Sequence, residues 1–540
     1  MKTAILRRAW LPLIPLLAAC GGGDGGPGEV SGDPVPGGTA IIAVLSDFQA
    51  FNPVVNTSIL TDEVIKQMLF TPLIRYDEDL QPQPHLAERW ELSDSAVVFH
   101  LRSDVRWHDG QPVTAEDVKF TFDLAKDPTT ASLLGSAYMN QVASATVVDP
   151  QTIRFDFIAP HAQALDGFWW APLPRHLLQD VAAGDLIQAP FNQQPVGSGP
   201  FRFVSWQRNQ QLVLEANDSF PAGLGGRPHL DRAVFRVIPE PTTMITELMS
   251  GSADLIGYTL LPDQAVQLQN QSGVELRHFP SREFTYVGWN NERPLFNEPA
   301  VRQALAMSIN RPELIRALMH GLAAPAAGMI PPWSPMYTEI EPLPYDPERA
   351  RQLLGEAGWT DSNGDGMLDR GGQPFQFTLL VNSANRMHQD LATVIQQGLR
   401  ELGIGVELRT VEFQTLLQQH KARDYDAVIS NWTLDTFKVD PTPLFTCAEA
   451  RTAGSANRAG FCDPAVDALI ERGLRTTDAG AAKQTWAEFS RLLQERQPIT
   501  FLFWSEDLAG VGMRVQGMVT DVRSKIANID RWWIPESRRR

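Results

Sequence analysis

Residues 375–432 have the sequence FQFTLLVNSANRMHQDLATVIQQGLRELGIGVELRTVEFQTLLQQHKARDYDAVISNW. Three short apolar runs in this stretch predict β-strands, at residues 375–381, 406–411 and 425–432. The segments between them, 387–402 and 413–420, predict helices, the first of them amphipathic. Strands that alternate with helices predict an α/β domain with a mostly parallel sheet.

The last of these strands ends in an aromatic residue, an acid and a turn. Trp432 closes the strand, and Asp435 follows three residues later, before Asp440-Pro441. Ligands of open α/β sheets bind beyond the carboxyl ends of the strands, so Trp432 and Asp435 are candidate ligand contacts. The alternative is an aromatic residue that caps the core and an acid in a solvated turn.

Length and composition limit the class of protein. The chain has 540 residues, 43% of them hydrophobic and 20% charged, which predicts an ordinary globular protein of two or three domains. Its formal net charge of -17 repels nucleic acid and anionic lipid surfaces, so we expect no nucleic-acid partner.

The N-terminal segment has the features of a targeting signal. Lys2, Arg7 and Arg8 precede an apolar run, which ends in Leu17-Ala18-Ala19-Cys20. This resembles the bacterial lipoprotein signal, which implies that residues 1–19 are removed and that Cys20 is lipidated. Residues 20–38 are rich in Gly and Pro and predict a flexible tether. The alternative is a plain secretory signal with an incidental cysteine.

Two further cysteines, Cys447 and Cys462, flank a polar loop. Outside the cytoplasm this spacing favours a disulfide, with metal binding as the alternative. Residues 361–369 also have the opening of a calcium-binding loop, but Gly372 stands where such a loop requires Glu. We interpret this segment as an Asp/Asn/Gly turn, with calcium as the alternative.

Residues 86–118 contain the densest group of motifs. They include Leu86-Ala87-Glu88, Trp90, Phe99-His100-Leu101-Arg102, His108-Asp109-Gly110 and Thr114-Ala115-Glu116-Asp117-Val118. Their spacing resembles the signature of the family 5 extracellular solute-binding proteins, the oligopeptide and dipeptide receptors of ABC importers. Gly197-Ser198-Gly199-Pro200-Phe201 is similar to that family's Gly-Thr-Gly-Pro-Tyr turn. The resemblance extends over residues 39–520.

The resemblance implies an α/β fold of the periplasmic-binding-protein type, class II-like, with two lobes, a ligand cleft between them and an extra third domain. Lobe I would comprise residues 39–75, 190–286 and 505–535. The extra domain would comprise residues 76–189 and lobe II residues 287–504. Ligand contacts with both lobes would stabilise a closed state.

The resemblance also implies a function and a set of site residues. The protein would capture peptides in the periplasm or at the cell surface and deliver them to a membrane permease, acting as a monomer without a cofactor. Asp435 would pair with the peptide's α-ammonium, and Trp432 would form an apolar wall. The position where dipeptide receptors have an Arg for the ligand carboxylate falls on Asn382, so Arg386 is the candidate substitute, and the neighbouring Asn385 is a further candidate ligand contact.

Other functions remain as alternatives. The 14 Trp residues, including Trp169-Trp170 and Trp532-Trp533, are compatible with stacking on an oligosaccharide, although we favour packing in the core and between lobes. A sensory lipoprotein of the same fold is a second alternative. A secreted hydrolase is disfavoured, because His108 and Asp109 are adjacent in a turn and no nucleophile is placed beside them.

Overall fold

The computed structural model describes residues 33–130, 132–434 and 437–540. The segment 375–432 forms the predicted elements in the predicted order. They are β16 (Gln376–Asn382), α10 (Arg386–Arg400), β17 (Gly405–Val411), α11 (Phe413–Lys421) and β18 (Ala427–Thr433). β16 pairs in parallel with both β17 and β18, which is the arrangement that strand–helix–strand units require.

The sheet that contains these strands has eleven strands within the described residues, in the order β17-β16-β18-β12-β19-β11-β1-β10-β9-β8, with β13 beside β19. The further strands are β1 (Thr39–Val44), β8 (Phe201–Gln207), β9 (Gln211–Ala216), β10 (Arg232–Val237), β11 (Leu255–Ile256), β12 (Val274–Trp289), β13 (Ala323–Pro325) and β19 (Ile499–Gly512). β12 pairs antiparallel with β18 and β19. The whole sheet is therefore mixed. Parallel pairing, as expected, joins β16 to β17 and β18, and it also joins β1 to β10 and β11.

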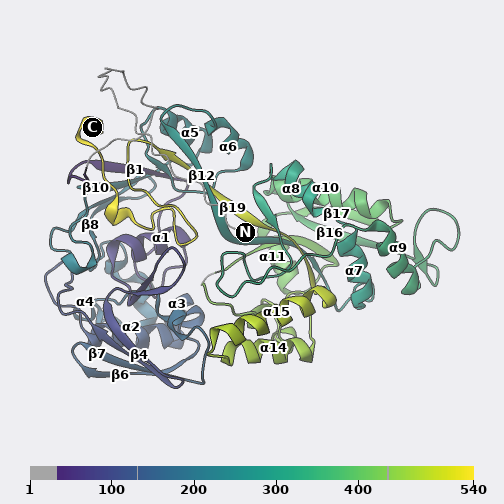
Figure 1. The fold of residues 1–540 in the computed structure, drawn as a ribbon, viewed down its shortest axis with the longest axis horizontal. Helices are drawn as coiled ribbons and strands as arrows, with labels where there is room; N and C mark the ends of the chain where they lie inside the picture. Colours follow the sequence, from purple (N-terminus) through teal and green to yellow (C-terminus); the bar gives the residue numbers. More distant parts are fainter. Residues whose placement is uncertain (1–32, 131, 435–436) are drawn as a thin grey trace, which may run out of the picture. The chain divides into compact units, whose positions relative to one another are not determined.

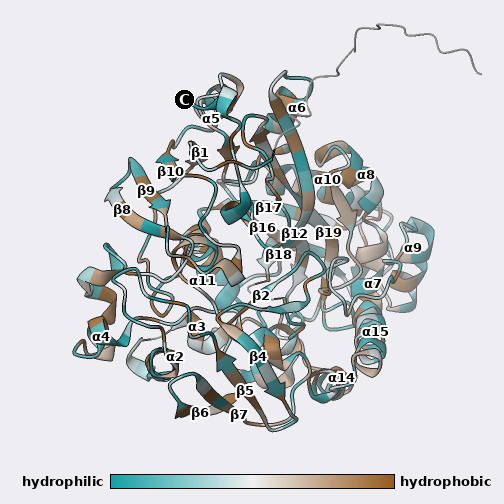
Figure 2. Cartoon of the chain, turned by 60° about the vertical axis from the view of Figure 1, so that its left-hand side comes forward, coloured by the Kyte–Doolittle hydropathy of each residue, from teal (hydrophilic) through white to brown (hydrophobic). Residues whose placement is uncertain are grey.

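β12 and β19 join two groups of elements (Figure 1). One hydrophobic core, the first core, is built largely from residues 40–235 and the C-terminal segment. A second core surrounds β16–β18, and a third lies under α14 and α15. Peripheral helices carry both hydrophilic and hydrophobic segments (Figure 2). The buried face of α10 consists of His388, Leu391, Ala392, Ile395 and Leu399.

A separate antiparallel sheet has the order β4-β5-β7-β6. Its strands are β4 (Ala87–Leu92), β5 (Ala96–Leu101), β6 (Val142–Asp149) and β7 (Thr152–Phe157), and the small hairpins are β2 (Ile74–Tyr76) with β3 (Pro82–Pro84) and β14 (Asp369–Arg370) with β15 (Gln373–Pro374). α2 (Ala115–Lys126) begins after Thr114, whose backbone N–H donates to Asp117 Oδ2 at 2.9 Å. This closes the predicted N-terminus of the helix.

The remaining helices surround these sheets. They are α1 (Ile59–Val64), continued by a π-helical turn η1 (Ile65–Leu69), α3 (Leu133–Ala137), α4 (Arg175–Leu178), α5 (Pro241–Met249), α6 (Pro262–Leu268), α7 (Pro299–Met307), α8 (Arg311–Leu318), α9 (Pro347–Glu356), α12 (Thr442–Phe445), α13 (Cys447–Arg451), α14 (Pro464–Arg475) and α15 (Ala479–Arg496). Within the described ranges, none of the helices has the length and apolarity needed to cross a bilayer.

His108 has a structural role. Its Nδ1 accepts from Gly197 N–H at 3.2 Å, and its Nε2 lies 3.1 Å from Gly199 O. A Cβ on Gly197 would lie 1.8 Å from Leu69 O, so this turn requires glycine for its close approach to η1. Asp109 instead contacts His176 at 2.7 Å. The two motifs that carry the resemblance therefore hold one another in place.

Cys447 and Cys462 form a disulfide. Between them, the Asn457 side chain donates to Thr446 O at 3.0 Å and to Phe461 O at 2.7 Å. These bonds fix the polar loop beside α14. Cys20, the signal segment 1–19 and most of the tether 20–38 lie outside the described residues.

Candidate functional site

The carboxyl end of β18 places Trp432 beside the third core. Trp432 pairs with Phe284 of β12 and packs, partly buried, against that core. The Arg458 guanidinium lies 5.9 Å from the centre of its ring. The Trp432 ring therefore packs against the core and keeps some exposed surface, and its contact with a ligand stays a prediction.

Asp435 lies outside the described residues, and the chain resumes at Phe437. The Phe437 ring is 5% exposed. It stacks on Trp169 at 5.1 Å between ring centres and meets Tyr76 edge-on at 5.0 Å and Trp333 at 5.7 Å. The segment that follows β18 thus inserts an aromatic side chain into the first core.

Polar contacts reinforce this junction. Val439 N–H donates to Gln163 Oε1 at 3.1 Å, and Lys438 Nζ donates to Asn140 Oδ1 at 3.2 Å. Nearby, Ala162 N–H donates to Leu474 O at 2.7 Å. Residues 437–439 and α14 therefore contact residues 140–169 through both apolar and polar groups.

A buried carboxyl group lies behind the aromatic cluster. Asp166 accepts hydrogen bonds from the Tyr76 hydroxyl and from Gln163 Nε2. Burial raises the pKa of Asp166 to about 6, and these hydrogen bonds oppose the shift. Burial also lowers the pKa of the Lys438 ammonium, which Asp440 at 3.7 Å partly compensates.

Sequence reasoning missed the polar residues on β12. Glu283 accepts hydrogen bonds from Asn431 Nδ2 and from Thr433 Oγ1, the latter at 3.2 Å. Burial raises the pKa of Glu283. The preceding Arg282 lies 6.0 Å from the Phe437 ring. Arg282 and Glu283 are adjacent charged residues inside β12, and the positions on either side of them are buried. A charged pair within a strand is the signal that could have identified them.

The other predicted ligand residues lie where α10 begins. Asn385 caps this helix, and its side-chain oxygen accepts from His388 N–H at 3.0 Å. The Arg386 side chain is 85% exposed and pairs with Asp390 at 3.1 Å. Because β16 runs parallel to β18, these residues and Trp432 follow strands that end at the same edge of the sheet. Among the described residues no hydrogen bond or ion pair joins either of them to Trp432.

The paired tryptophans are core residues. Trp169 and Trp170 are 5% and 0% exposed, and Trp532 and Trp533 are 0% and 9% exposed. Their packing favours the core interpretation over an open stacking wall. In the calcium-like segment, Asp361 accepts from the backbone N–H groups of Gly364, Asp365 and Gly366, as the predicted turn requires. Over the described ranges, no group of three or more His, Cys, Asp or Glu side chains forms a metal site.

The sequence pattern of the bacterial extracellular solute-binding proteins, family 5 Middle, matches residues 81–452. The chain belongs to this family. Its membership confirms the predicted class, a substrate-binding protein of an ABC transporter, and the family consists of receptors rather than enzymes.

Full-length relatives agree with the family assignment. The chain is 28% identical to the oligopeptide-binding protein AppA of Bacillus subtilis over 549 residues, which cover 99% of each protein. It is 26% identical to the dipeptide-binding protein of Escherichia coli over 503 residues, 88% of this chain and 91% of that protein.

Solved structures of family 5 proteins share this architecture. AppA of Bacillus subtilis, in complex with a nonapeptide, superimposes with a TM-score of 0.76 at 27% identity, over 93% of this chain and 100% of that one. NikA of Brucella suis, in complex with Fe(III)-EDTA, gives a TM-score of 0.78 at 22% identity, over 92% and 100%. The predicted two-lobed fold is thereby confirmed.

Proposed function

We propose that this family 5 protein captures peptides between its two lobes and delivers them to an ABC permease. The observation that carries the proposal is the segment after β18, where Trp432 packs on the third core and Phe437 packs on the first. A ligand held at this junction would contact both groups of elements. The full-length similarity to a protein that was crystallised with a nonapeptide supports a peptide as the ligand.

The proposed lobes keep the boundaries that the resemblance implies. Lobe I comprises residues 39–75, 190–286 and 505–535, the extra domain 76–189, and lobe II 287–504. We further propose that Cys20 is lipidated and anchors a monomeric receptor to a bacterial membrane, in the periplasm or at the cell surface.

We assign the ligand contacts as follows. Asp435 pairs with the α-ammonium of the peptide, and Trp432 forms an apolar wall beside it. Asn385 and Arg386, at the same edge of the sheet, contact the carboxylate end. The peptide backbone pairs with main-chain groups, which leaves the side-chain pockets permissive.

The proposed pairing of Asp435 with the α-ammonium of the peptide is tested with Asp435→Asn. Native mass spectrometry of the gently purified protein identifies the enclosed peptide, which is then synthesised and titrated by calorimetry. We expect the substitution to weaken binding by about 3 kcal/mol or more, because it leaves a desolvated ammonium without its counter-charge.

Asp424→Asn is the matched control. Its carboxylate precedes the same strand, but the side chain is 78% exposed and lies 3.8 Å from Arg293, so peptide affinity should not change. If Asp435→Asn and the wild-type protein bind the peptide with equal affinity, Asp435 does not pair with its α-ammonium.

A further inference from the structure

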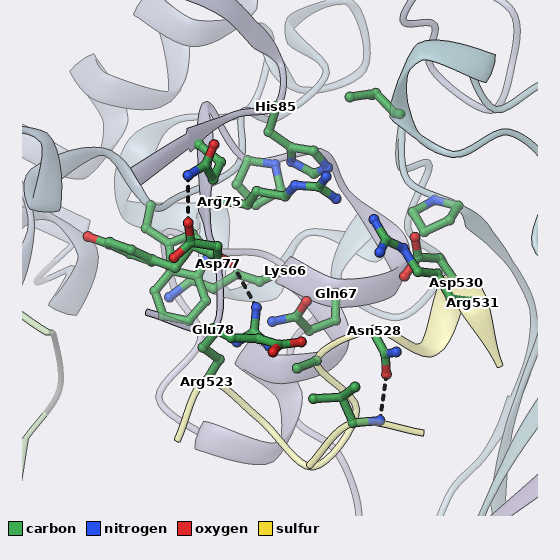
Figure 3. Close-up of a pocket in the computed structure, with 18 of the residues that line it drawn as sticks. Lys66, Gln67, Arg75, Asp77, Glu78, His85, Arg523, Asn528, Asp530 and Arg531 are labelled. Atoms are coloured by element: carbon green, nitrogen blue, oxygen red, sulfur yellow. Dashed lines mark hydrogen bonds between the residues drawn. The ribbon is translucent and has the colours of Figure 1, made fainter. Parts of the chain in front are cut away.

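A second feature of the molecule is a polar cavity of about 400 Å³ (Figure 3). Its walls come from η1, from the β2–β3 hairpin and from residues 519–531 of the C-terminal segment. All of its described lining residues lie within 66–85, 169–224 or 519–531, so the cavity is built without residues 287–504. Its volume is in the range of small-molecule sites and exceeds what an inorganic ion needs.

Arg75 points into this cavity because of strand alternation. Its neighbours in β2, Ile74 and Tyr76, are buried in the first core, whereas Arg75 is half-buried on the opposite face. Over the described ranges its guanidinium has no hydrogen-bond or ion-pair partner. A half-buried guanidinium that forms no hydrogen bond or close ion pair indicates a missing partner.

A second guanidinium converges on Arg75. Arg531 lines the same cavity and also has no hydrogen-bond or ion-pair partner in the described part of the chain. Burial lowers the pKa of Arg75, and the charges of Arg531 and Arg523 lower it further, against the opposing effect of Asp530. Asp530 lines the same cavity and has the largest charge effect on Arg75, but within the described residues no hydrogen bond or ion pair joins its carboxyl group to Arg75 or Arg531.

Two other charged groups of the cavity, Arg523 and Asp77, are already engaged. Arg523 pairs with Asp521 and donates to Tyr76 O at 3.0 Å. Asp77 accepts from Asp79 N–H, Gln81 N–H and Gln83 Nε2 at 3.0, 2.8 and 2.7 Å. These bonds close the β2–β3 turn, so the Asp77 carboxylate is not available to Arg75.

His85 also lines the cavity. It is 9% exposed, and its Nδ1 has no hydrogen-bond partner among the described residues. Burial and the charge of Arg75 lower its pKa to about 3, so the ring is neutral at physiological pH and adds no charge to the cavity.

We propose that this cavity binds a small organic anion whose carboxylate or phosphate oxygens pair with Arg75 and Arg531. The planar guanidinium matches both groups in two-point geometry. The neutral His85 side chain forms part of the cavity wall. This second site uses different ligand-binding groups from the proposed peptide site at β18, although Tyr76 and Trp169 line the cavity and also pack on Phe437.

Calorimetric titration of the full-length protein with succinate and with inorganic phosphate tests the proposal, in chloride buffer of matched ionic strength. We expect saturable binding of at least one probe, and the probe that binds identifies the anionic group. Arg75→Gln and Arg531→Gln should each weaken binding about tenfold or more, as expected for a lost charge-assisted hydrogen bond.

Arg316→Gln is the control, because its side chain is 74% exposed on α8 and pairs with Glu313. Asp435→Asn should also leave anion binding unchanged. Arg531 is exposed, so its substitution should not unfold the protein, and unchanged thermal midpoints verify this for each variant. The proposal is overturned if neither probe saturates, if both cavity variants bind as the wild type does, or if Arg316→Gln loses the same affinity.

Discussion

At the scale of single residues, buried histidines make this protein sensitive to acid. Burial lowers the pKa of five imidazoles to about 3 or 4: His85, His108, His161, His388 and His420. Each is neutral in the folded state but gains a proton near its ordinary pKa when the chain unfolds. The stability that these groups contribute is therefore complete above about pH 6.5 and is lost progressively below it.

His388 isolates this effect, because burial is the cause of its shift to about 4 and its Nδ1 has no partner among the described residues. Between pH 7.5 and pH 5 we expect the free energy of unfolding to fall by about 2 kcal/mol less in His388→Gln than in the wild type. Urea unfolding at the two pH values measures this difference. The control is His278→Gln, at a side chain that is 62% exposed. Equal pH dependence of His388→Gln and the wild type would contradict the prediction.

At the scale of elements, the start of α10 has two roles to separate. The Asn385 side-chain oxygen caps the helix, while its Nδ2 has no partner among the described residues and is available to a ligand. The predicted ligand role and the observed capping role thus use different atoms of one amide.

Two substitutions distinguish these roles. Asn385→Ala should lower the free energy of unfolding by about 1 kcal/mol, whereas Asn385→Ser should keep the cap and most of the stability. Because neither variant has an Nδ2 donor, we expect both to bind the co-purified peptide more weakly. Denaturant unfolding and calorimetry give the two readouts. Wild-type peptide affinity in Asn385→Ser would assign Asn385 to capping alone.

At the scale of the whole molecule, β12 and β19 connect the first core with the second and third. Their pairing runs from Val274 opposite Gly512 to Gly288 opposite Ile499, and its register is irregular between Pro280 and Phe284. Irregular pairing of this kind bends a strand pair locally. Across the junction, Phe437 stacks on Trp169 and Val439 N–H donates to Gln163, and we propose that these contacts stabilise the closed state.

We therefore expect the radius of gyration to fall when the peptide binds, as measured by solution scattering. Phe437→Ala should reduce the fraction of closed molecules and weaken peptide binding, because it removes the ring that stacks on Trp169. Phe413→Ala, at a side chain that is 48% exposed, is the matched control. Identical dimensions with and without saturating peptide would contradict closure.

The sequence by itself determined the elements from β16 to β18, the α/β character, the Thr114 start of α2 and the solute-binding family. Each depends on local periodicity, on capping residues or on motifs that are contiguous in the chain. The disulfide followed from the spacing of Cys447 and Cys462 and from the expected compartment.

Only the tertiary structure decided which distant residues meet. Glu283 contacts Asn431 and Thr433, Phe437 lies among Tyr76 and Trp169, and the unpaired guanidinium groups of Arg75 and Arg531 line one cavity. The antiparallel pairing of β12 with β19 also makes the sheet a mixed one, with both parallel and antiparallel strands. Local patterns carry no signal for such contacts, because chain closure over hundreds of residues and the burial of shared surface select them.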